Sequence, residues 1–366
     1  MSSIAYTVSN DLCTGCGVCE DVCPSHAIKM SVNQAKFVPV VDGSLCKSDK
    51  GCHRCFDACA GVGVNLKQIA NKIQSEDVFV SDPYIGNYLT CFTGYSLDSE
   101  LRYHSASGGV LSQLLIWLLE KKYIDGAVVT KFDSKEKLLV NTFVATTKEE
   151  IIQARSSKYA PVSLNHVISD IKQRKGKYVI VGLPCHIQSF RKYEQMDSVF
   201  KNMIFAYFGL YCSYGRTFDL TSYVLKKRNV SLENLNYFAY RDEGCLGSMI
   251  VKGESTTKHT PVNIKEKFEH YYLPLRAFFV PRRCLLCVDH FSELADVSFG
   301  DIHIPPYIND EIGVNSVVVR NEKLLSLIKM ARDENYIHLD ALSADVLLSS
   351  QKVLFQKKKR VDTYLK

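Results

Sequence analysis

Apolar residues recur along the chain with two spacings, one typical of helices and one typical of strands. Leu111, Leu114 and Leu118 lie three and four residues apart, so they share one face of a predicted helix. Elsewhere the apolar residues form short runs, which are typical of strands with little exposure to solvent. The pattern predicts helices over residues 65–75 and 110–122 and strands over 127–132, 178–181 and 203–211.

Helical and strand segments alternate from about residue 85 onward, and this alternation predicts an α/β body built on a mixed sheet. Residues 1–60 are different, because most of the cysteines are concentrated there. A linker is expected near residues 81–83, where Pro83 interrupts the pattern. The predicted fold is therefore an α/β body preceded by a small α+β head.

Composition and charge place the chain among soluble globular proteins. Its 366 residues are 46% hydrophobic and 23% charged, with a net charge of +6. The longest apolar runs, 110–119 and 203–212, are shorter than the roughly 20 residues that a membrane helix needs. The chain also opens without a basic and apolar leader, so we expect a cytoplasmic protein with no membrane span. Lys and Arg are dispersed, which disfavours a nucleic-acid partner.

Cysteine is over-represented, with fourteen in total and eight within the first 59 residues. The first four follow the C-x2-C-x2-C-x3-C-P spacing of bacterial ferredoxins, in which three cysteines bind one 4Fe-4S cluster and the fourth binds a second. The next four repeat this spacing with a longer first gap. The predicted ligand sets are Cys13, Cys16, Cys19 and Cys59 for one cluster, and Cys46, Cys52, Cys55 and Cys23 for the other.

Zinc and disulfide bonds are the alternatives for these eight cysteines. Zinc sites use isolated C-x2-C pairs, each of which supplies two of the four ligands of a tetrahedron. Here three closely spaced cysteines are followed by Cys23-Pro24, which is more cysteines than one such pair contains. Disulfide bonds are not expected in a chain without a secretory leader. The five-residue gap after Cys46 leaves the geometry of the second cluster open, but not its existence.

Four further cysteines form a candidate group in the body. Cys185 and Cys212 each follow a predicted buried strand, so both emerge at one sheet edge if the two strands are neighbours. Cys284 and Cys287 form a C-x2-C pair. One interpretation is a third 4Fe-4S cluster bound by all four, and the other is that Cys185 and Cys212 are buried thiols while only the pair is reactive. The two cysteines left over, Cys91 and Cys245, are expected to be structural.

A loop rich in serine and glycine precedes the predicted helix that begins at Val110. Hydroxyls and backbone N–H groups at a helix N-terminus form an anion site, so this loop is a candidate for binding a phosphate or pyrophosphate. The alternative is that Ser107 only caps the helix. No G-x-G-x-x-G or G-x-x-x-x-G-K-[ST] motif is present, so a nicotinamide site or an NTPase loop is not expected. The residues of the candidate loop are Ser105, Ser107, Gly108 and Gly109.

Six stretches of the body resemble the family of coenzyme F420 hydrogenase/dehydrogenase beta subunits, here preceded by a two-cluster ferredoxin module. The resemblance implies a flavin, normally FAD rather than FMN, beside a 4Fe-4S cluster bound by the four body cysteines. The matching stretches are RYHSASGG at 102–109, SSKYAPV at 156–162, VGLPCHIQ at 181–188, GLYC at 209–212, RCLLC at 283–287 and ADVSFGD at 295–301.

The resemblance also assigns roles to individual residues. It implies that the loop of residues 105–109 binds the flavin phosphates and that Lys158 and Tyr159 contact the flavin. Asp301 and His303 are further candidates for the cofactor site. His186, beside Cys185, is a candidate proton donor, but a hydrogen bond to a cluster sulfide is the preferred interpretation.

The chain divides into four predicted parts. Residues 1–80 form a two-cluster ferredoxin-like domain, 85–165 an N-terminal-type region of the family, 166–345 a C-terminal-type domain, and 346–366 a basic tail. The tail contains the run Lys357 to Arg360, which we expect to be solvated.

The cofactors predict the function. Clusters transfer single electrons and hydride transfer moves two, so a flavin is needed between them. The predicted activity is an oxidoreductase that passes electrons between 4Fe-4S clusters and a flavin, which exchanges hydride with an organic substrate of the coenzyme F420 type. The expected partners are a one-electron protein, either ferredoxin or reductase or hydrogenase subunits, and a small-molecule hydride donor or acceptor. The alternatives are a ferredoxin-dependent reductase of another organic substrate, such as one in polysaccharide biosynthesis, and an electron-transfer subunit with no substrate of its own.

Overall fold

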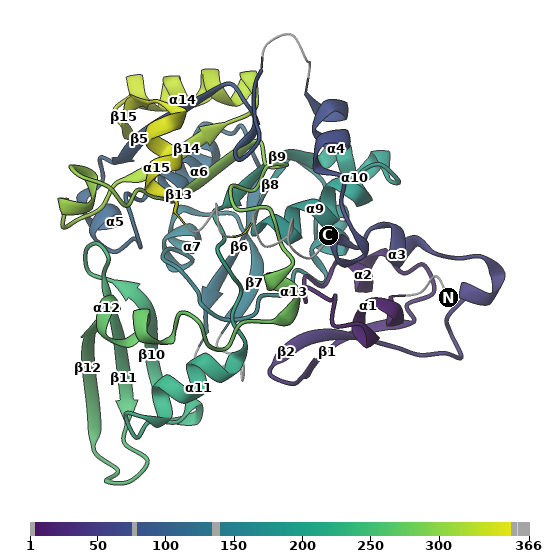
Figure 1. The fold of residues 1–366 in the computed structure, drawn as a ribbon, viewed down its shortest axis with the longest axis horizontal. Helices are drawn as coiled ribbons and strands as arrows, with labels where there is room; N and C mark the ends of the chain where they lie inside the picture. The colour runs from purple at the N-terminus through teal and green to yellow at the C-terminus, as the bar shows by residue number, and fades with distance from the viewer. Residues whose placement is uncertain (1–3, 75–78, 134–139, 353–356, 358–366) are drawn as a thin grey trace.

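The computed structural model describes residues 4–74, 79–133, 140–352 and 357. Residues 4–62, which we call the head, lie beside a larger body built on an eight-stranded sheet (Figure 1). A separate three-stranded sheet extends from one end of the body. The predicted fold class, a mixed α/β body preceded by a small cysteine-rich head, is confirmed.

The eight-stranded sheet has four parallel strands at its centre and antiparallel strands at both edges. Its order is β15-β5-β14-β13-β9-β8-β6-β7, in which β13, β9, β8 and β6 are parallel. The strands predicted at 127–132, 178–181 and 203–211 are β6, β8 and β9. The strand bounds are β5 Thr90–Ser96, β6 Gly126–Phe132, β7 Val140–Ala145, β8 Tyr178–Gly182, β9 Ile204–Leu210, β13 Val297–Asp301, β14 Asn315–Val319 and β15 Ile337–Leu342.

Helices cover both faces of this sheet, because central parallel strands are apolar on both sides. One face packs against α6 and α14 around the fully buried Trp117, and the other packs against α8, α9 and α10 around Phe190. The helix predicted at 110–122 is α6, which ends two residues earlier. The helix bounds are α5 Ser99–Tyr103, α6 Val110–Glu120, α7 Lys148–Gln153, α8 Val167–Arg174, α9 Pro184–Tyr193, α10 Ser198–Met203, α14 Glu322–Asp333 and α15 Ala344–Ser350.

The three-stranded antiparallel sheet encloses a second apolar core of its own. Tyr240, Phe268 and Tyr272 are buried there, and Tyr159 of the body packs against them. Its elements are α11 Phe218–Lys226, η3 Leu232–Asn234, β10 Leu235–Asp242, β11 Ser248–Glu254, β12 Pro261–Lys267, α12 Phe268–Tyr271 and η4 Leu273–Leu275, followed by α13 Arg282–Leu285 and, later in the chain, η5 Tyr307–Asn309.

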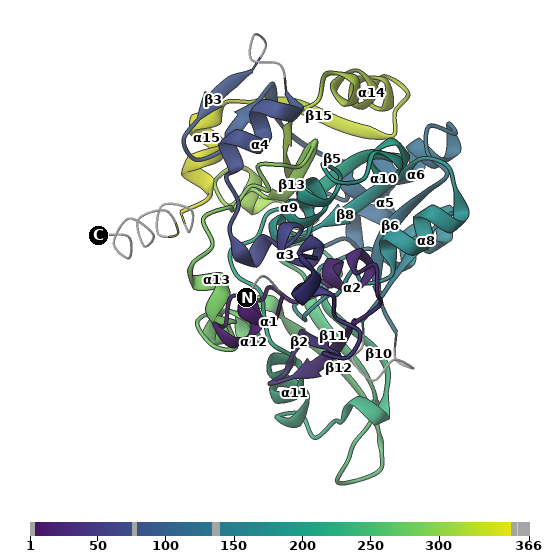
Figure 2. The same cartoon turned by 90° about the vertical axis from the view of Figure 1, so that its right-hand side faces the viewer.

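The head is a β-hairpin with short helices, and it packs against α8 and α9 of the body (Figure 2). The amide of Leu164 donates to the carbonyl of Cys16 at 2.8 Å, and the amide of Ile168 donates to Asp21 Oδ2 at 2.8 Å. These bonds fix the head in one orientation on the body. Its elements are α1 Ala5–Ser9, α2 Val18–Val22, β1 Ile28–Asn33, β2 Lys36–Val41, η1 Ser48–Lys50, α3 Arg54–Asp57 and η2 Ala60–Val62.

Three expectations change in the segments that flank the body. The predicted helix 65–75 is α4, Leu66–Ile73, capped by Asn65, and Ser75 lies outside the described residues. The linker expected at 81–83 is instead part of a small hairpin, β3 Val80–Asp82 with β4 Gly86–Tyr88. The tail predicted from residue 346 begins inside α15.

The tail is also not solvated at Lys357, because this side chain is only 2% exposed. Residues 358–366 lie outside the described part of the chain. No helix among the described residues is long and apolar enough to cross a membrane.

Candidate functional site

The carboxyl ends of the central parallel strands lie at one edge of the sheet, which is where open α/β sheets place their ligands. β8 and β9 are parallel neighbours, with Val181 paired to Phe208, so the condition stated for Cys185 and Cys212 is met. Cys185 follows β8 and Cys212 follows β9, so both cysteines emerge at this edge. Asp301, at the end of β13, lies at the same edge.

Cys185 and Cys212 meet the C-x2-C pair at this edge, and we call these four residues the body group. Burial raises the pKa of the Cys212 thiol to about 12; the charge of Lys357 lowers it, while Cys284 and Cys287 raise it. The amide of Gly215 donates to Cys284 Sγ at 3.3 Å. The four thiols are therefore close enough to interact, and one of them has a backbone donor. The members are Cys185, Cys212, Cys284 and Cys287.

The first predicted set of head cysteines also gathers, and we call it the middle group. Burial raises the pKa of the Cys19 thiol, and the charges of the other three thiols raise it further. Backbone amides donate to two sulfurs, from Gly15 to Cys13 Sγ at 3.4 Å and from Gly61 to Cys59 Sγ at 3.2 Å. Such donors stabilise thiolates, which iron–sulfur clusters require of their ligands. The members are Cys13, Cys16, Cys19 and Cys59.

The second set, which we call the outer group, lines a cavity of about 350 Å³ measured out to its mouth. Ile4, Ile28 and Val41 form apolar walls, and the amide of Ala27 donates to Cys23 Sγ at 3.3 Å. The long gap after Cys46 is taken up by the turn of η1, so that cysteine still reaches the cavity. The members are Cys23, Cys46, Cys52 and Cys55.

The three groups follow one another in space. Among the charges that raise the pKa of Cys19 is that of Cys55, which links the middle group to the outer group. Burial and then Cys212 and Cys16 raise the pKa of Cys185, which links the middle group to the body group. The order along the molecule is therefore outer, middle and body.

All fourteen cysteines lie among the described residues and all are free thiols. Of the twelve grouped cysteines, four are buried and eight are partly exposed. Cys91 lies apart in β5 and is 2% exposed, as expected of a structural residue.

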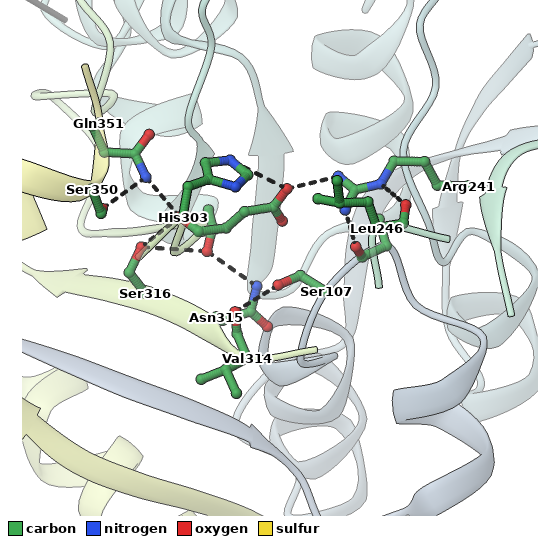
Figure 3. Close-up of polar contacts among 12 residues, drawn as sticks. Ser107, Arg241, Leu246, His303, Val314, Asn315, Ser316, Ser350 and Gln351 are labelled. Atoms are coloured by element: carbon green, nitrogen blue, oxygen red, sulfur yellow. Dashed lines mark hydrogen bonds and ion pairs between the residues drawn. The ribbon is translucent and has the colours of Figure 1, made fainter. Parts of the chain in front are cut away.

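The serine and glycine loop at 105–109 is closed by the protein itself. Ser107 Oγ donates to the carbonyl of Val314 at 2.8 Å (Figure 3). The first amide of α6, that of Val110, donates to Asn315 Oδ1 at 3.1 Å. A Cβ at Gly108 would lie 2.5 Å from the carbonyl of Gly94. Ser107 does not cap α6, because the N-cap is Gly109.

The other hydroxyl of this loop is also taken, since Ser105 Oγ donates to the carbonyl of Leu101 at 2.7 Å. Both hydroxyls therefore have protein acceptors. Phosphate binding by this loop stays a prediction.

Asp301 pairs with Arg241 at 2.8 Å, and His303 Nε2 lies 3.8 Å away (Figure 3). Burial opposes ionisation of Asp301, but Arg241 and then His303 hold its pKa below the usual 3.8. Arg241 also donates to the carbonyls of Ala106 and Leu246. The pair thus joins the eight-stranded sheet, the loop at 105–109 and the three-stranded sheet.

Lys158 and Tyr159 are engaged with protein groups. Lys158 Nζ donates to three carbonyls at the end of α7, those of Ala154, Arg155 at 2.7 Å and Ser156 at 3.0 Å. Burial and then the charge of Arg155 lower the pKa of Lys158 to about 7. The carbonyl acceptors act in the opposite direction, because they favour the charged ammonium.

His186 is buried and hydrogen-bonded to the backbone at both ring nitrogens. It is 3% exposed, its Nε2 donates to the carbonyl of Val162, and its Nδ1 accepts from the amide of Leu183. Burial lowers the pKa of His186 to about 4, so the ring is neutral. Backbone groups occupy both ring nitrogens, so these contacts do not support either suggested role for His186.

A cleft of about 490 Å³ opens between the end of β6, α7 and β10. Phe132 and Phe238 form apolar walls, and Lys131 and Arg155 line it with positive charge beside the carboxylates of Asp133 and Asp242. Among the described residues, neither cation forms an ion pair. The cleft is thus shaped for a large ligand with an anionic portion.

One wall of the cleft carries a histidine that sequence reasoning missed. His104 Nδ1 lies 2.7 Å from Asp242 Oδ1, and Tyr237 donates to Asp242 Oδ2 at 2.8 Å. Asp242 is 6% exposed and so orients the ring, while Nε2 of the partly exposed His104 lies 3.7 Å from Glu100 Oε2. His104 lies in the RYHSASGG stretch, but its partner Asp242 is 138 residues away, so the local sequence does not predict their contact.

Aromatic rings connect the cleft to the body group. From the cleft wall, Phe132 contacts Tyr240 at 5.5 Å between ring centroids, and Tyr240 contacts Tyr159 at 5.4 Å. Tyr159 in turn contacts Tyr272 at 4.3 Å. Burial raises the pKa of Tyr272, and the Cys212 thiol is among the nearby charges that also raise it.

Known families match this chain along most of its length. The N-terminal model of the coenzyme F420 hydrogenase/dehydrogenase beta subunit matches residues 91–169, and the C-terminal model matches 175–345. A 4Fe-4S binding domain matches residues 6–29, which assigns iron–sulfur rather than zinc chemistry to the head.

Individual relatives agree with the family matches. The chain is 27% identical over 341 residues to a component of the F(420)H(2) dehydrogenase of Methanosarcina mazei, covering 92% of this chain and 87% of the relative. It is 25% identical over 330 residues to the coenzyme F420-dependent sulfite reductase of Methanocaldococcus jannaschii, covering 86% of this chain but only 45% of that protein.

A solved structure shares the fold. A chain of the F420-reducing [NiFe] hydrogenase complex from Methanosarcina barkeri superposes with a TM-score of 0.58 at 22% identity. The match covers 78% of this chain and 94% of that one. At this identity the likeness speaks for the fold alone.

Proposed function

Because this chain belongs to the family of coenzyme F420 hydrogenase/dehydrogenase beta subunits, with a 4Fe-4S head, we propose that it is an iron–sulfur flavoprotein oxidoreductase. It passes electrons between three 4Fe-4S clusters and a flavin that exchanges hydride with an organic substrate. The observation that carries the proposal is the serial order of the three cysteine groups and the aromatic contacts that continue from the body group to the cleft.

Each cysteine group supplies four thiolates to one cluster, and the clusters supply one-electron steps. The protein holds the groups in series, excludes water from them and directs backbone amides at Cys13, Cys59 and Cys284. The outer group has the cavity with a mouth, so the one-electron protein partner docks there.

The cleft holds the flavin, which converts single electrons to hydride when bound. Phe132 and Phe238 provide apolar walls for a ring system, and Lys131 and Arg155 bind its phosphates. His104 Nε2 holds the proton that accompanies hydride transfer, and Asp242 keeps the ring in position. Relatives of this chain are named for coenzyme F420, so the substrate is of the deazaflavin type and the one-electron partner is another protein of the same enzyme complex.

Cofactor content is the first test. Anaerobically reconstituted protein should contain about twelve iron and twelve sulfide per chain, together with one flavin. Replacing Arg155 by Gln should weaken flavin retention about tenfold, because a phosphate loses its charged partner. Arg332→Gln, on the exposed end of α14 and paired with Asp333 alone among the described residues, is the matched control and should retain flavin normally.

The substrate is tested by anaerobic stopped-flow spectroscopy of the flavin. Reduced coenzyme F420 should bleach the flavin rapidly, and electrons should then appear in the clusters. Bleaching by reduced ferredoxin alone would favour a reductase of another organic substrate. A protein that binds clusters but no flavin would exclude the whole hydride mechanism.

A further inference from the structure

One helix face contacts both the middle group and the body group. Cys185, Ser189 and Lys192 lie four and then three residues apart on α9, so they project from the same side. Cys185 belongs to the body group, whereas Lys192 Nζ donates to the carbonyl of Cys59 at 2.7 Å in the head. Between them Ser189 is completely buried, with its Oγ 3.5 Å from Cys16 Sγ.

The direction of the Ser189 hydrogen bond follows from its second partner. The amide of Ala60 donates to Ser189 Oγ at 3.1 Å, so the oxygen accepts there and its own hydrogen remains free. Cys16 as a cluster ligand is a thiolate and has no hydrogen to give. Ser189 therefore donates O–H to the sulfur.

The Ser189 hydroxyl differs from the other donors to the middle group because it belongs to the body and not to the head. Cys13 and Cys59 receive bonds from amides of the head itself, Gly15 and Gly61. The bond to Cys16 comes from the body, across the contact between the two parts. Its presence thus depends on the head being seated on α9.

We propose that Ser189 is a positioning residue that raises the reduction potential of the middle cluster. The inference rests on the proposed function, since it requires a cluster at the middle group. A hydrogen bond to a ligand sulfur draws electron density from it and stabilises the additional negative charge of the reduced cluster. The cluster nearest the body is thereby made a better electron acceptor once the head is docked.

The test is a redox titration of the full-length, reconstituted protein, followed by electron paramagnetic resonance. In Ser189→Ala, the signal of one cluster should shift to lower potential while the other two keep theirs. Ser189→Thr retains the hydroxyl and should restore the wild-type value. Ser163→Ala is the matched control, because Ser163 Oγ is buried beside Gly17 at the same contact and has no hydrogen-bond partner among the described residues.

Three unchanged potentials in Ser189→Ala would overturn the inference, as would an equal shift in Ser163→Ala or a shift of all three clusters together. If Ser189→Ala does not keep its iron, the potentials of Ser189→Thr and Ser189→Val are compared instead. These two side chains have nearly the same shape, but only Thr has the hydroxyl, so the Val variant should have the lower potential. Failure of the proposed function is seen separately, since wild-type protein would then lack iron at the middle group before any titration.

Discussion

Lys357 Nζ lies 3.7 Å from Sγ of Cys287, inside the wall of the body group. It also donates to the carbonyls of Cys212 at 2.9 Å and Asp289 at 3.0 Å. Burial disfavours the charge, but Cys287, Cys212 and Asp289 raise the pKa of Lys357, so the ammonium stays protonated. Lys357 thus places a positive charge beside two of the candidate ligands, Cys212 and Cys287.

Replacing Lys357 by Met should lower the reduction potential of a cluster bound by the body group, because an adjacent positive charge stabilises its reduced form. It should also cost about 1–3 kcal/mol of unfolding free energy by leaving buried carbonyls without a donor. Redox titration and urea unfolding measure the two effects. Lys357→Arg keeps the charge and is the control; equal potentials in the Met and Arg variants would show that the charge has no role.

Iron content should separate ligand cysteines from structural ones. Cys212→Ala removes one member of the body group, so iron should fall from about twelve to about eight per chain. Cys245→Ala, a cysteine outside the three groups, should leave it unchanged. Iron and sulfide analysis of anaerobically purified protein gives both numbers, and an identical iron content in the two variants would contradict a third cluster.

Gly17→Ala should weaken the packing of the head against the body. Gly17 has φ +83°, and an added Cβ would lie 2.2 Å from Ser163 Oγ and 2.6 Å from the amide of Asn165. Strain and overlap together should cost more than about 1 kcal/mol of stability. Limited proteolysis should then release the head faster than in wild type. Gly43→Ala is the matched control, since no atom lies within 4 Å of its added Cβ; equal proteolysis of the two variants would refute the prediction.

Stability should depend on the ionisation of Asp301. Arg241 holds its pKa below the usual 3.8, so the pair contributes stability above about pH 4 and loses it as the pH falls through the lowered pKa. Asp301→Asn leaves the buried Arg241 without its counter-ion and should cost about 3–5 kcal/mol at pH 7. Urea unfolding at pH 7 and pH 3 should show that the difference from wild type narrows at the lower pH. A constant difference would mean that the ion pair contributes nothing.

The sequence was most informative where function depends on local spacing. The C-x2-C runs are enough to predict the two head groups, because ligand spacing is a local rule. The body group was one of two interpretations until the family resemblance was added, because it depends on the pairing of two strands that are distant in the chain. The family match then supports the resemblance noted from six short stretches.

The sequence did not predict the hydrogen-bond partners of several side chains, because these partners are distant in the chain. His186 is bound by the carbonyl of Val162, and Lys357 by carbonyls more than sixty residues away, so neither environment is visible in a local pattern. His104 was missed for the same reason, since its partner Asp242 lies in the three-stranded sheet. Only tertiary structure shows which polar groups are already satisfied.

The face of α9 that bears Cys185, Ser189 and Lys192 also fixes the number of residues between Cys185 and Ser189. An α-helix turns about 100° per residue, so inserting or deleting one residue between Cys185 and Ser189 would swing the head contacts to another side of the helix. The head and the body would each keep their own hydrogen bonds, yet they would no longer meet. The spacing of residues along α9 therefore cannot change without separating the head from the body.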